Sequence, residues 1–388
     1  MYVGGFLARS AYEFQLATVH EQWNALCSHD SQPTQEIQSQ LTFQVLHALK
    51  FFTFYPSTPS SDVSSAMEAG FFSCATKGQF SILSTKGVRN SKDVRLPDPI
   101  FSGFLKELPT LPNEIVAGAP SIVSSLQRNG MITEITFQDV LRELQARPLS
   151  IREFIACLEW WIGVCREGDN ESLLHIRQQL QDAIILTIEE EGAEGSQVMP
   201  LASIRSFINL KSSNGGIPLD GPLPKYLLPI AISKTFKPEE LSAAFPWTEL
   251  TVVQWLQFIC DANVPKHSAD FDINISPSWA ERVLVLLARV WPTLPVQTKE
   301  EIHAILYDKT CIPTSSGMQT PAQSYFPNVN MFRDLPVVTF PSGKIANGSL
   351  EKVLKSLGVR KHVELQLIFN RYALRLSNYH YLMISQND

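Results

Sequence analysis

Three stretches of the chain resemble one another at a constant interval of 115 positions. TEITFQDVL begins at Thr133, TELTVVQWL begins at Thr248, and the fainter VELQLIFNR begins at Val363. A sequence that recurs at this interval favours several similar units of ordinary domain size over one continuous core. We therefore expect an array of tandem modules, and we expect binding surfaces distributed along it in place of one catalytic centre.

Two further matches agree with this spacing. The Leu-Pro pair that starts at Leu108 returns near Leu223 and again near Leu335. The segment 82–98 aligns without a gap with the segment 312–328, two intervals later, and Gly87 is aligned with Gly317. Because the three signals involve different residues, their agreement strengthens the prediction of a repeat.

The predicted organisation is a lead-in over residues 1–40 and modules over 41–148, 149–262 and 263–388. The predicted fold class is α+β and predominantly α-helical, with helices and a small β-hairpin in each module of about 115 residues. We expect hairpins near Ser81–Leu96, with a loop of four to eight residues, and near Cys311–Phe326. The lead-in carries an amphipathic helix from Phe6 to Leu26, which we interpret as a tether.

Helix boundaries follow from capping patterns. Ser or Thr stands three residues before Glu, Asp or Gln at Ser150, Thr136 and Thr251, which is the spacing of a capping box. The remaining expectations are a Ser276 cap followed by proline, helices over Pro99–Glu107 and Asn113–Asn129, glycine stops at Gly130 and Gly358, and a Ser349 cap on the last helix of the third module.

Composition excludes several classes of protein. Charged residues make up 18% of the 388 residues and the net charge is −6, so broad contact with nucleic acid is not expected. The start of the chain lacks a signal-peptide pattern and no apolar run could span a bilayer, which favours an intracellular protein, cytoplasmic more than nuclear, that does not enter a membrane. The cysteines never form CxxC, so we expect neither a metal nor a cofactor.

No catalytic motif is present in the sequence. Phosphate-binding GxxxxGK[ST], the nucleophile motif GxSxG and the zinc motif HExxH are all missing. Cys311 and His303, or Cys165 and His175, could still meet in space as a nucleophile and base, and SLEK at Ser349 fits a bare SxxK. We therefore expect a protein without enzymatic activity and keep a Cys or Ser hydrolase as an alternative.

Several segments resemble a known family. LHALKFFTFYPSTPSSDVSSAMEAGFFSC, LPTLP and DVLRELQARPLS resemble a fungal family of unknown function whose members carry an N-terminal ATPase domain of the sacsin and NO VEIN type. IPTSSG at Ile312, with LP at Leu335 and LGVR at Leu357, is similar to a segment of the sacsin repeats. That ATPase belongs to the superfold of gyrase, histidine kinases and heat-shock chaperones. Its Asp-x-Gly-x-Gly lid is absent, because Asp220-Gly221 is followed by Pro222, so the resemblance implies a region downstream of the ATPase and transfers no nucleotide-binding residue.

The predicted function is non-catalytic binding of a client or regulatory protein. The expected contacts lie at the tips of the hairpins, because loops on a rigid scaffold often carry recognition. They are Lys86, Arg89 and Lys92 in the first module and Ser315, Ser316 and Gln319 in the third. A winged-helix-like nucleic-acid module is the other alternative, since helices and a small hairpin occur together.

Overall fold

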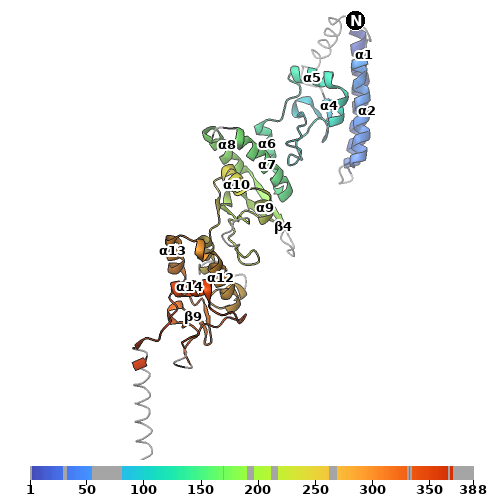
Figure 1. Cartoon of the computed structure of the whole chain (residues 1–388). Coiled ribbons are helices and arrows are strands. Elements are labelled where there is room, and N and C mark those ends of the chain that lie inside the picture. The colour runs from blue at the N-terminus through green and yellow to red at the C-terminus, as the bar shows by residue number, and fades with distance from the viewer. Residues whose placement is uncertain are drawn as a thin grey trace, which may run out of the picture. The chain divides into compact units, whose positions relative to one another are not determined.

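The computed structural model describes residues 2–28, 33–54, 81–168, 170–189, 196–210, 217–261, 269–329, 332, 334–365 and 368–369 (Figure 1). Helices predominate and the strands form small sheets, so the predicted α+β class is confirmed. The chain divides into two compact units, Met1–Ser203 with Ala243–Phe245, and Ile204–Ser242 with Pro246–Asp388. The three predicted modules stay a prediction.

The first part of the first unit is a helix pair packed on a hairpin. Its elements are α1 (Tyr2–Cys27), α2 (Gln35–Phe54), β1 (Ser81–Ser84), β2 (Gly87–Asn90), the 3-10 helix η1 (Ser91–Asp93), α4 (Asn113–Gly118) and α5 (Pro120–Arg128). The Tyr12 hydroxyl donates to the Ser81 carbonyl oxygen at 3.0 Å, and Val19 is completely buried in the same core as Ile82. The predicted lead-in helix therefore packs into the first core and does not stand apart as a tether.

The rest of the first unit is built on three helices and a three-stranded sheet. These elements are α6 (Phe137–Ala146), β3 (Leu149–Ser150), α7 (Ile151–Glu167), α8 (Asn170–Ala183), β4 (Ile185–Glu189), β5 (Ser196–Pro200) and η2 (Leu201–Ser203). Strand β4 pairs in parallel with β3 and antiparallel with β5. The buried Trp161 indole donates to the Ala244 carbonyl oxygen at 2.8 Å, which draws residues 243–245 into this unit.

The second unit begins with short elements and ends on a helical core with a hairpin. They are β6 (Ser206–Phe207), α9 (Ile230–Thr235), α10 (Pro238–Ala244), β7 (Thr248–Glu249), α11 (Val252–Cys260), η3 (Ala269–Phe271), α12 (Pro277–Val290), η4 (Trp291–Thr293), α13 (Val296–Leu306), β8 (Ile312–Thr314), β9 (Gly317–Gln319), η5 (Pro321–Gln323) and α14 (Gly348–Leu357). The last two residues of α10 belong to the first unit. Helix α12 carries the centre of the core, where Val283, Leu284 and Leu287 are completely buried.

The capping patterns specify helix starts as predicted. The side chains of Thr136, Ser150 and Thr251 each accept a hydrogen bond from the backbone N–H three residues later, and the reciprocal bond completes each capping box. Ser276 caps α12 ahead of Pro277, and Gly130 and Gly358 take φ of 65° and 105°.

Four local predictions are wrong. The first hairpin turns over two residues, Thr85 and Lys86, and not over four to eight. Residues 99–104 form turns, because Pro99 and Gly103 interrupt the expected helix. The helix predicted over 113–129 divides into α4 and α5, since Pro120 starts a new helix after Ala119. The cap of α14 is Asn347, so Ser349 lies inside the helix.

The two predicted hairpins have matching hydrogen bonds. The hydroxyl of Ser84 donates to the Gly87 carbonyl oxygen at 2.7 Å, and that of Thr314 donates to the Gly317 carbonyl oxygen at 2.6 Å. After each hairpin an extended residue donates to the carbonyl oxygen of the proline in a Leu-Pro pair: Arg95 N to Pro109 O at 3.0 Å, and Tyr325 N to Pro336 O at 2.9 Å.

The middle segment has the same bond, displaced in sequence. Here the Tyr226 carbonyl oxygen accepts from Arg205 N at 2.9 Å and lies 3.4 Å from Ser206 N, so the position of Pro109 is occupied by Tyr226 and not by Pro224. The recurrent TE segments also pair in the same way, because Thr133 pairs in parallel with Arg95 and Thr248 pairs in parallel with Ser206. In the last segment Tyr325 bridges Arg360, three residues before the aligned Val363.

Candidate interaction surfaces

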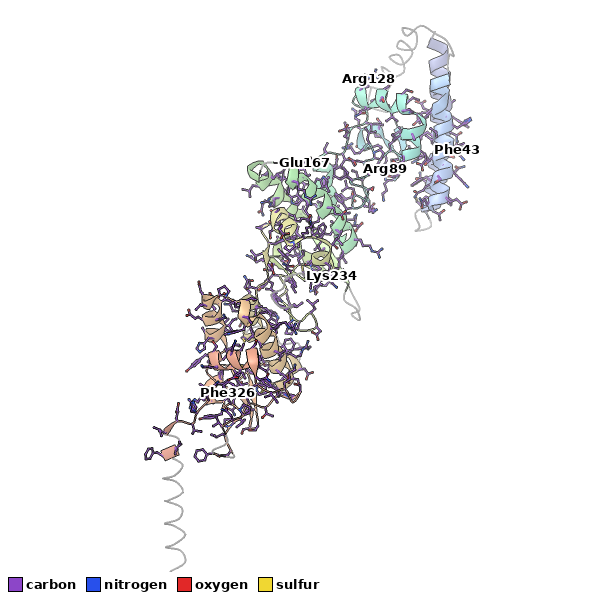
Figure 2. All side chains as sticks on the ribbon, in the orientation of Figure 1. Phe43, Arg89, Arg128, Glu167, Lys234 and Phe326 are labelled. Carbon is purple, nitrogen blue, oxygen red and sulfur yellow. The ribbon has the colours of Figure 1, made fainter. Side chains whose placement is uncertain are left out.

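The predicted contact residues of the first hairpin do not all project into solvent. Nζ of Lys86 lies 3.0 Å from Oε2 of Glu107, and only 17% of the Lys86 side chain is exposed. Arg89, labelled in Figure 2, and Lys92 are exposed. Arg89 and Lys92 are therefore the residues of this tip that can reach a partner.

The equivalent tip in the second unit is held by its own fold. Oγ of Ser315 accepts a hydrogen bond from Val337 N and lies 3.3 Å from the Leu335 carbonyl oxygen, to which it donates. Ser316 is exposed and Gln319 is half-buried. Ser315 is also exposed, although its hydroxyl is hydrogen-bonded to the segment that contains the Leu-Pro pair, so Ser315 and Ser316 are the exposed predicted contacts of this tip.

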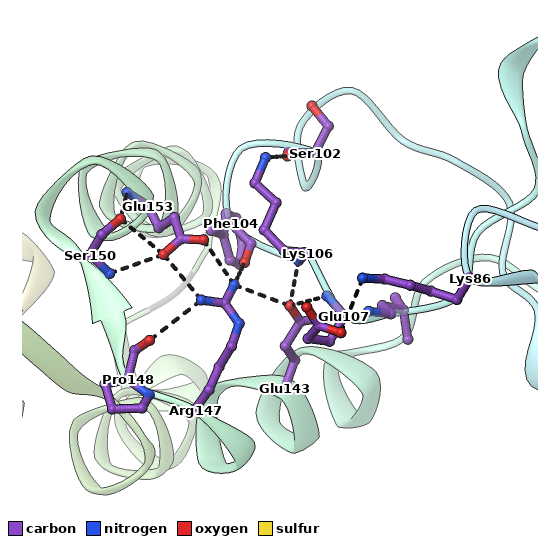
Figure 3. A network of polar contacts seen from close by, with 11 residues as sticks. Lys86, Ser102, Phe104, Lys106, Glu107, Glu143, Arg147, Pro148, Ser150 and Glu153 are labelled. Carbon is purple, nitrogen blue, oxygen red and sulfur yellow. Dashed lines mark hydrogen bonds and ion pairs between the residues drawn. The ribbon is translucent and has the colours of Figure 1, made fainter. Parts of the chain in front are cut away.

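A network of charged side chains lies next to the first tip (Figure 3). The buried Glu143 of α6 accepts hydrogen bonds from three successive backbone N–H groups, those of Lys106, Glu107 at 2.8 Å and Leu108 at 2.9 Å. These bonds fix the loop segment that carries Glu107, the partner of Lys86. Sequence reasoning missed them because the partners lie more than thirty residues apart and the donors are backbone groups.

Arg147 closes this network. Its Nη2 donates to the Phe104 carbonyl oxygen at 2.9 Å and to Glu153 at 3.0 Å, and its Nη1 donates to Glu153 at 3.1 Å. Burial would raise the pKa of Glu153, but the hydrogen bonds from Arg147 and Ser150 outweigh it and lower the pKa. Both carboxylates are held by internal donors, which is typical of a structural network and leaves neither poised as a general base.

A second ion pair joins the start of α6 to Arg95 in the extended segment after the hairpin. Nε and Nη2 of Arg95 donate to the two carboxylate oxygens of Asp139 at 2.8 and 3.0 Å. Burial alone would raise the pKa of Asp139, but hydrogen bonds from Arg95 and Thr136 and the charge of Arg95 lower it to about 2. Asp139 is thus both a helix cap and half of a buried pair, which makes it an anchor of the first core.

Among the described residues, Cys311 and His303, one of the two Cys/His pairs considered for the hydrolase alternative, have other neighbours. The Cys311 thiol points to the Leu306 carbonyl oxygen at 3.8 Å, while His303 stacks against Tyr307 with 5.3 Å between ring centroids. Burial raises the pKa of Cys311 to about 12 and also raises the pKa of Cys165, which lies beside Arg177. Burial thus disfavours the thiolate form of both cysteines, and at Cys165 the neighbouring Arg177 opposes this effect.

A charged groove on α12 was not predicted from the sequence. It has a volume of about 260 Å³ and contains four charged and three apolar residues, Pro218, Glu281, Arg282, Val285, Leu286, Arg289 and Lys344. Its residues come from three separate segments of the second unit, so no local pattern could have revealed it. Within the described ranges, no helix is long and apolar enough to cross a membrane, and His, Cys, Asp and Glu nowhere gather into a group that could hold a metal ion.

Comparison with known proteins gives one family. Neither the curated proteins nor the solved structures contain a match to this chain. The sequence family described as "Protein of unknown function (DUF3684)" matches residues 1–380, which is nearly the whole sequence. The chain therefore belongs to the DUF3684 family.

Proposed function

We propose that the chain is a non-catalytic scaffold of tandem modules that binds a client or regulatory protein through several weak surfaces. The matching hydrogen bonds around the hairpins support tandem modules, because they involve equivalent backbone groups at the spacing that the sequence repeats. The predicted resemblance to regions downstream of a sacsin-type ATPase supports a role beside a chaperone-like enzyme. Linked weak contacts gain affinity from their high effective concentration.

The observation that carries this proposal is a set of large apolar side chains exposed on helices of both units. Phe14 of α1 and Phe43 of α2, the latter labelled in Figure 2, are 76% and 66% exposed. They adjoin in sequence Gln15 and Gln44, whose side chains hydrogen-bond across the helix pair at 3.1 Å. Aromatic side chains on rigid helices are typical contact residues of protein interfaces.

The second unit shows the same feature on α13. Val296, the first residue of α13, is 71% exposed, and Tyr307, which caps the end of this helix, is 51% exposed. A spacing of eleven residues is about three helical turns, so both side chains lie on the same side at opposite ends of the helix. Two apolar surfaces in different units fit distributed binding better than one deep pocket. The paired cations Lys86 and Arg95 are less suited to phosphate contacts, so the nucleic-acid alternative has no comparable support.

Cross-linking with mass spectrometry in the source cells tests the proposal. Partners are identified with the wild-type chain and then measured with Phe14→Ser/Phe43→Ser, with Val296→Ser/Tyr307→Ser and with all four changes. We expect each pair to lower the cross-linked yield of one partner about threefold to tenfold and the quadruple change to abolish it.

The matched control is Arg128→Ser/Glu167→Ser, which changes two exposed side chains labelled in Figure 2. It should leave the yield unchanged. A quadruple variant with native circular dichroism that still cross-links like the wild type would exclude these surfaces as binding sites.

A further inference from the structure

The groove on α12 lies where the corresponding helix of the first unit is covered. Helices α7 and α12 both begin with a serine cap, Ser150 and Ser276. When the two helices are aligned on these caps, Leu286 of α12 takes the position of Trp160 of α7, ten residues after the cap. In the first unit, Phe101 and Phe104 pack on Trp160 with ring centroids 5.5 and 5.8 Å apart. This face of the helix is therefore one on which aromatic side chains can pack.

A glycine lets a chain turn pack closely on α7 and another does so on α12, but the two turns contact different positions along the helices. A Cβ on Gly103 would lie 2.6 Å from the Cβ of Ala156, and a Cβ on Gly221 would lie 2.3 Å from the Trp279 ring. Trp279 is three residues after its cap and Ala156 is six after its own, so the turn in the second unit packs about one helical turn nearer the helix start. The later part of α12, with Val285 and Arg289, stays open.

The charged side chains of the groove differ in whether they have ion-pair or hydrogen-bond partners. Arg282 donates to both oxygens of Asp220 at 2.7 and 2.9 Å. The buried Glu281 accepts hydrogen bonds from the backbone N–H and the hydroxyl of Ser342, and Lys344 Nζ lies 3.8 Å from it. The exposed Arg289 has neither an ion pair nor a hydrogen bond within the described part of the chain. Arg282 and Lys344 are thus paired with the two carboxylates, and Arg289 is the cation of the groove left without a partner among the described residues. The apolar lining is the half-buried Val285 beside the buried Leu286.

We propose that this groove binds a peptide segment of a partner protein in which an aromatic side chain is flanked by carboxylates. The aromatic ring packs on Val285 and Leu286, as Phe101 and Phe104 pack on Trp160, and the carboxylates contact Arg289 and Lys344. A volume of about 260 Å³ accommodates one ring and its flanking groups, which is smaller than a typical metabolite pocket. This inference rests on the proposed function, since it assigns one of the binding surfaces.

Calorimetric titration of the full chain tests the assignment. The probes are a capped decapeptide of glutamate with two phenylalanines, the same peptide with alanine in place of phenylalanine, and one with lysine in place of glutamate. We expect saturable binding of the first peptide only. Arg289→Glu/Lys344→Glu should weaken that binding by about tenfold or more, because two attractive contacts become repulsive.

The matched control is Lys352→Glu/Lys355→Glu, which makes the same change of charge on the exposed side of α14, outside the groove. It should change the dissociation constant by no more than about twofold. Equal weakening in both double variants, or equal binding of the alanine peptide, would overturn the assignment, and competition by inorganic phosphate at millimolar concentration would mean that the groove takes a small anion instead.

The cross-linking experiment separates this inference from the proposed function. If a partner is captured through the apolar surfaces and Arg289→Glu/Lys344→Glu captures it equally well, the groove assignment fails while the scaffold proposal stands. If the wild type cross-links no partner and does not bind the peptide, both fail.

Discussion

Several charged residues form ion pairs inside this fold and stabilise it. Arg95 and Asp139 form a bidentate ion pair, and only 2% of the Asp139 side chain is exposed. Removing one member of a buried pair leaves an uncompensated charge, which costs several kcal/mol. The same charges are therefore poor candidates for recognition.

Acidification should reveal the contribution of Asp139. Its pKa is lowered to about 2 in the folded chain, so the stabilisation is present above the ordinary pKa of about 3.9 and is lost as the pH falls towards 2. We expect wild-type stability to decrease between about pH 5 and pH 2, with about 2–3 kcal/mol of that decrease due to this residue. Asp139→Asn should be less stable at pH 7 and less sensitive to acid in thermal unfolding, whereas Glu114→Gln on the exposed side of α4 should follow the wild type.

Local residue patterns were predictable, and long-range ones were not. The capping boxes at Thr136, Ser150 and Thr251 use groups three residues apart, so the sequence contains both partners. The hydrogen bonds that the backbone N–H groups of residues 106–108 donate to Glu143 depend on how α6 packs against a distant loop segment. A glutamate in an amphipathic helix gives no sign of such a role.

Hairpin elements show how the same turn is used in two environments. Gly87 and Gly317 take φ of 85° and 95°, in the left-handed region that glycine enters without strain. A Cβ on Gly87 would lie 2.9 Å from Nε1 of Trp23 in α1, whereas a Cβ on Gly317 would meet nothing within 4 Å. The first turn is therefore covered by a helix and the second is open.

Replacing each glycine by alanine separates backbone strain from packing. Gly317→Ala should cost about 1–2 kcal/mol, because only the backbone conformation is unfavourable. Gly87→Ala should cost about 1–3 kcal/mol more, because Trp23 must also move. Hydrogen exchange of α1 provides the readout: it should accelerate in Gly87→Ala alone, and unchanged exchange there would contradict the packing of α1 on this hairpin.

The sequence alignment found the hairpin elements but not their exact boundaries. Gly87 and Gly317 aligned correctly because both occupy the left-handed position of the turn. The turn itself was predicted too long, since Thr85 and Lys86 do not resemble the Asn-Gly pairs of most two-residue turns. Likewise the Leu-Pro pair at Leu223 points to Pro224, two residues before Tyr226, whose carbonyl oxygen accepts the hydrogen bond. Any residue has a backbone carbonyl oxygen, so the sequence does not show which one is the acceptor.

At the scale of the whole molecule, compact units and sequence modules differ. The compact units divide after Ser203, whereas the sequence repeat predicts modules that begin at residues 149 and 263. The Trp161–Ala244 bond explains part of the difference, because it joins a short segment of the later chain to the first unit. Such a distant contact depends on tertiary packing, so composition and periodicity could not have predicted it.

The first unit should need this later segment for its stability. Phe245 is 1% exposed and its ring centroid lies 6.3 Å from that of Trp161, while Nη2 of Arg177 donates to the Ala243 carbonyl oxygen at 3.0 Å. Loss of the buried ring and of these hydrogen bonds should cost about 3–5 kcal/mol. A fragment of residues 1–203 should therefore unfold at a lower urea concentration than one of residues 1–261.

Phe245→Ala in the full chain tests the same contact without truncation. Leaving a cavity beside Trp161 should cost about 3–5 kcal/mol and accelerate hydrogen exchange in α7, because Trp161 lies at the centre of that helix. Leu174→Ala, at a side chain 64% exposed on α8, is the control and should leave exchange in α7 unchanged. If Phe245→Ala also leaves α7 unchanged and the two fragments are equally stable, residues 243–245 do not belong to the first core, and the division of the chain into these two units is wrong.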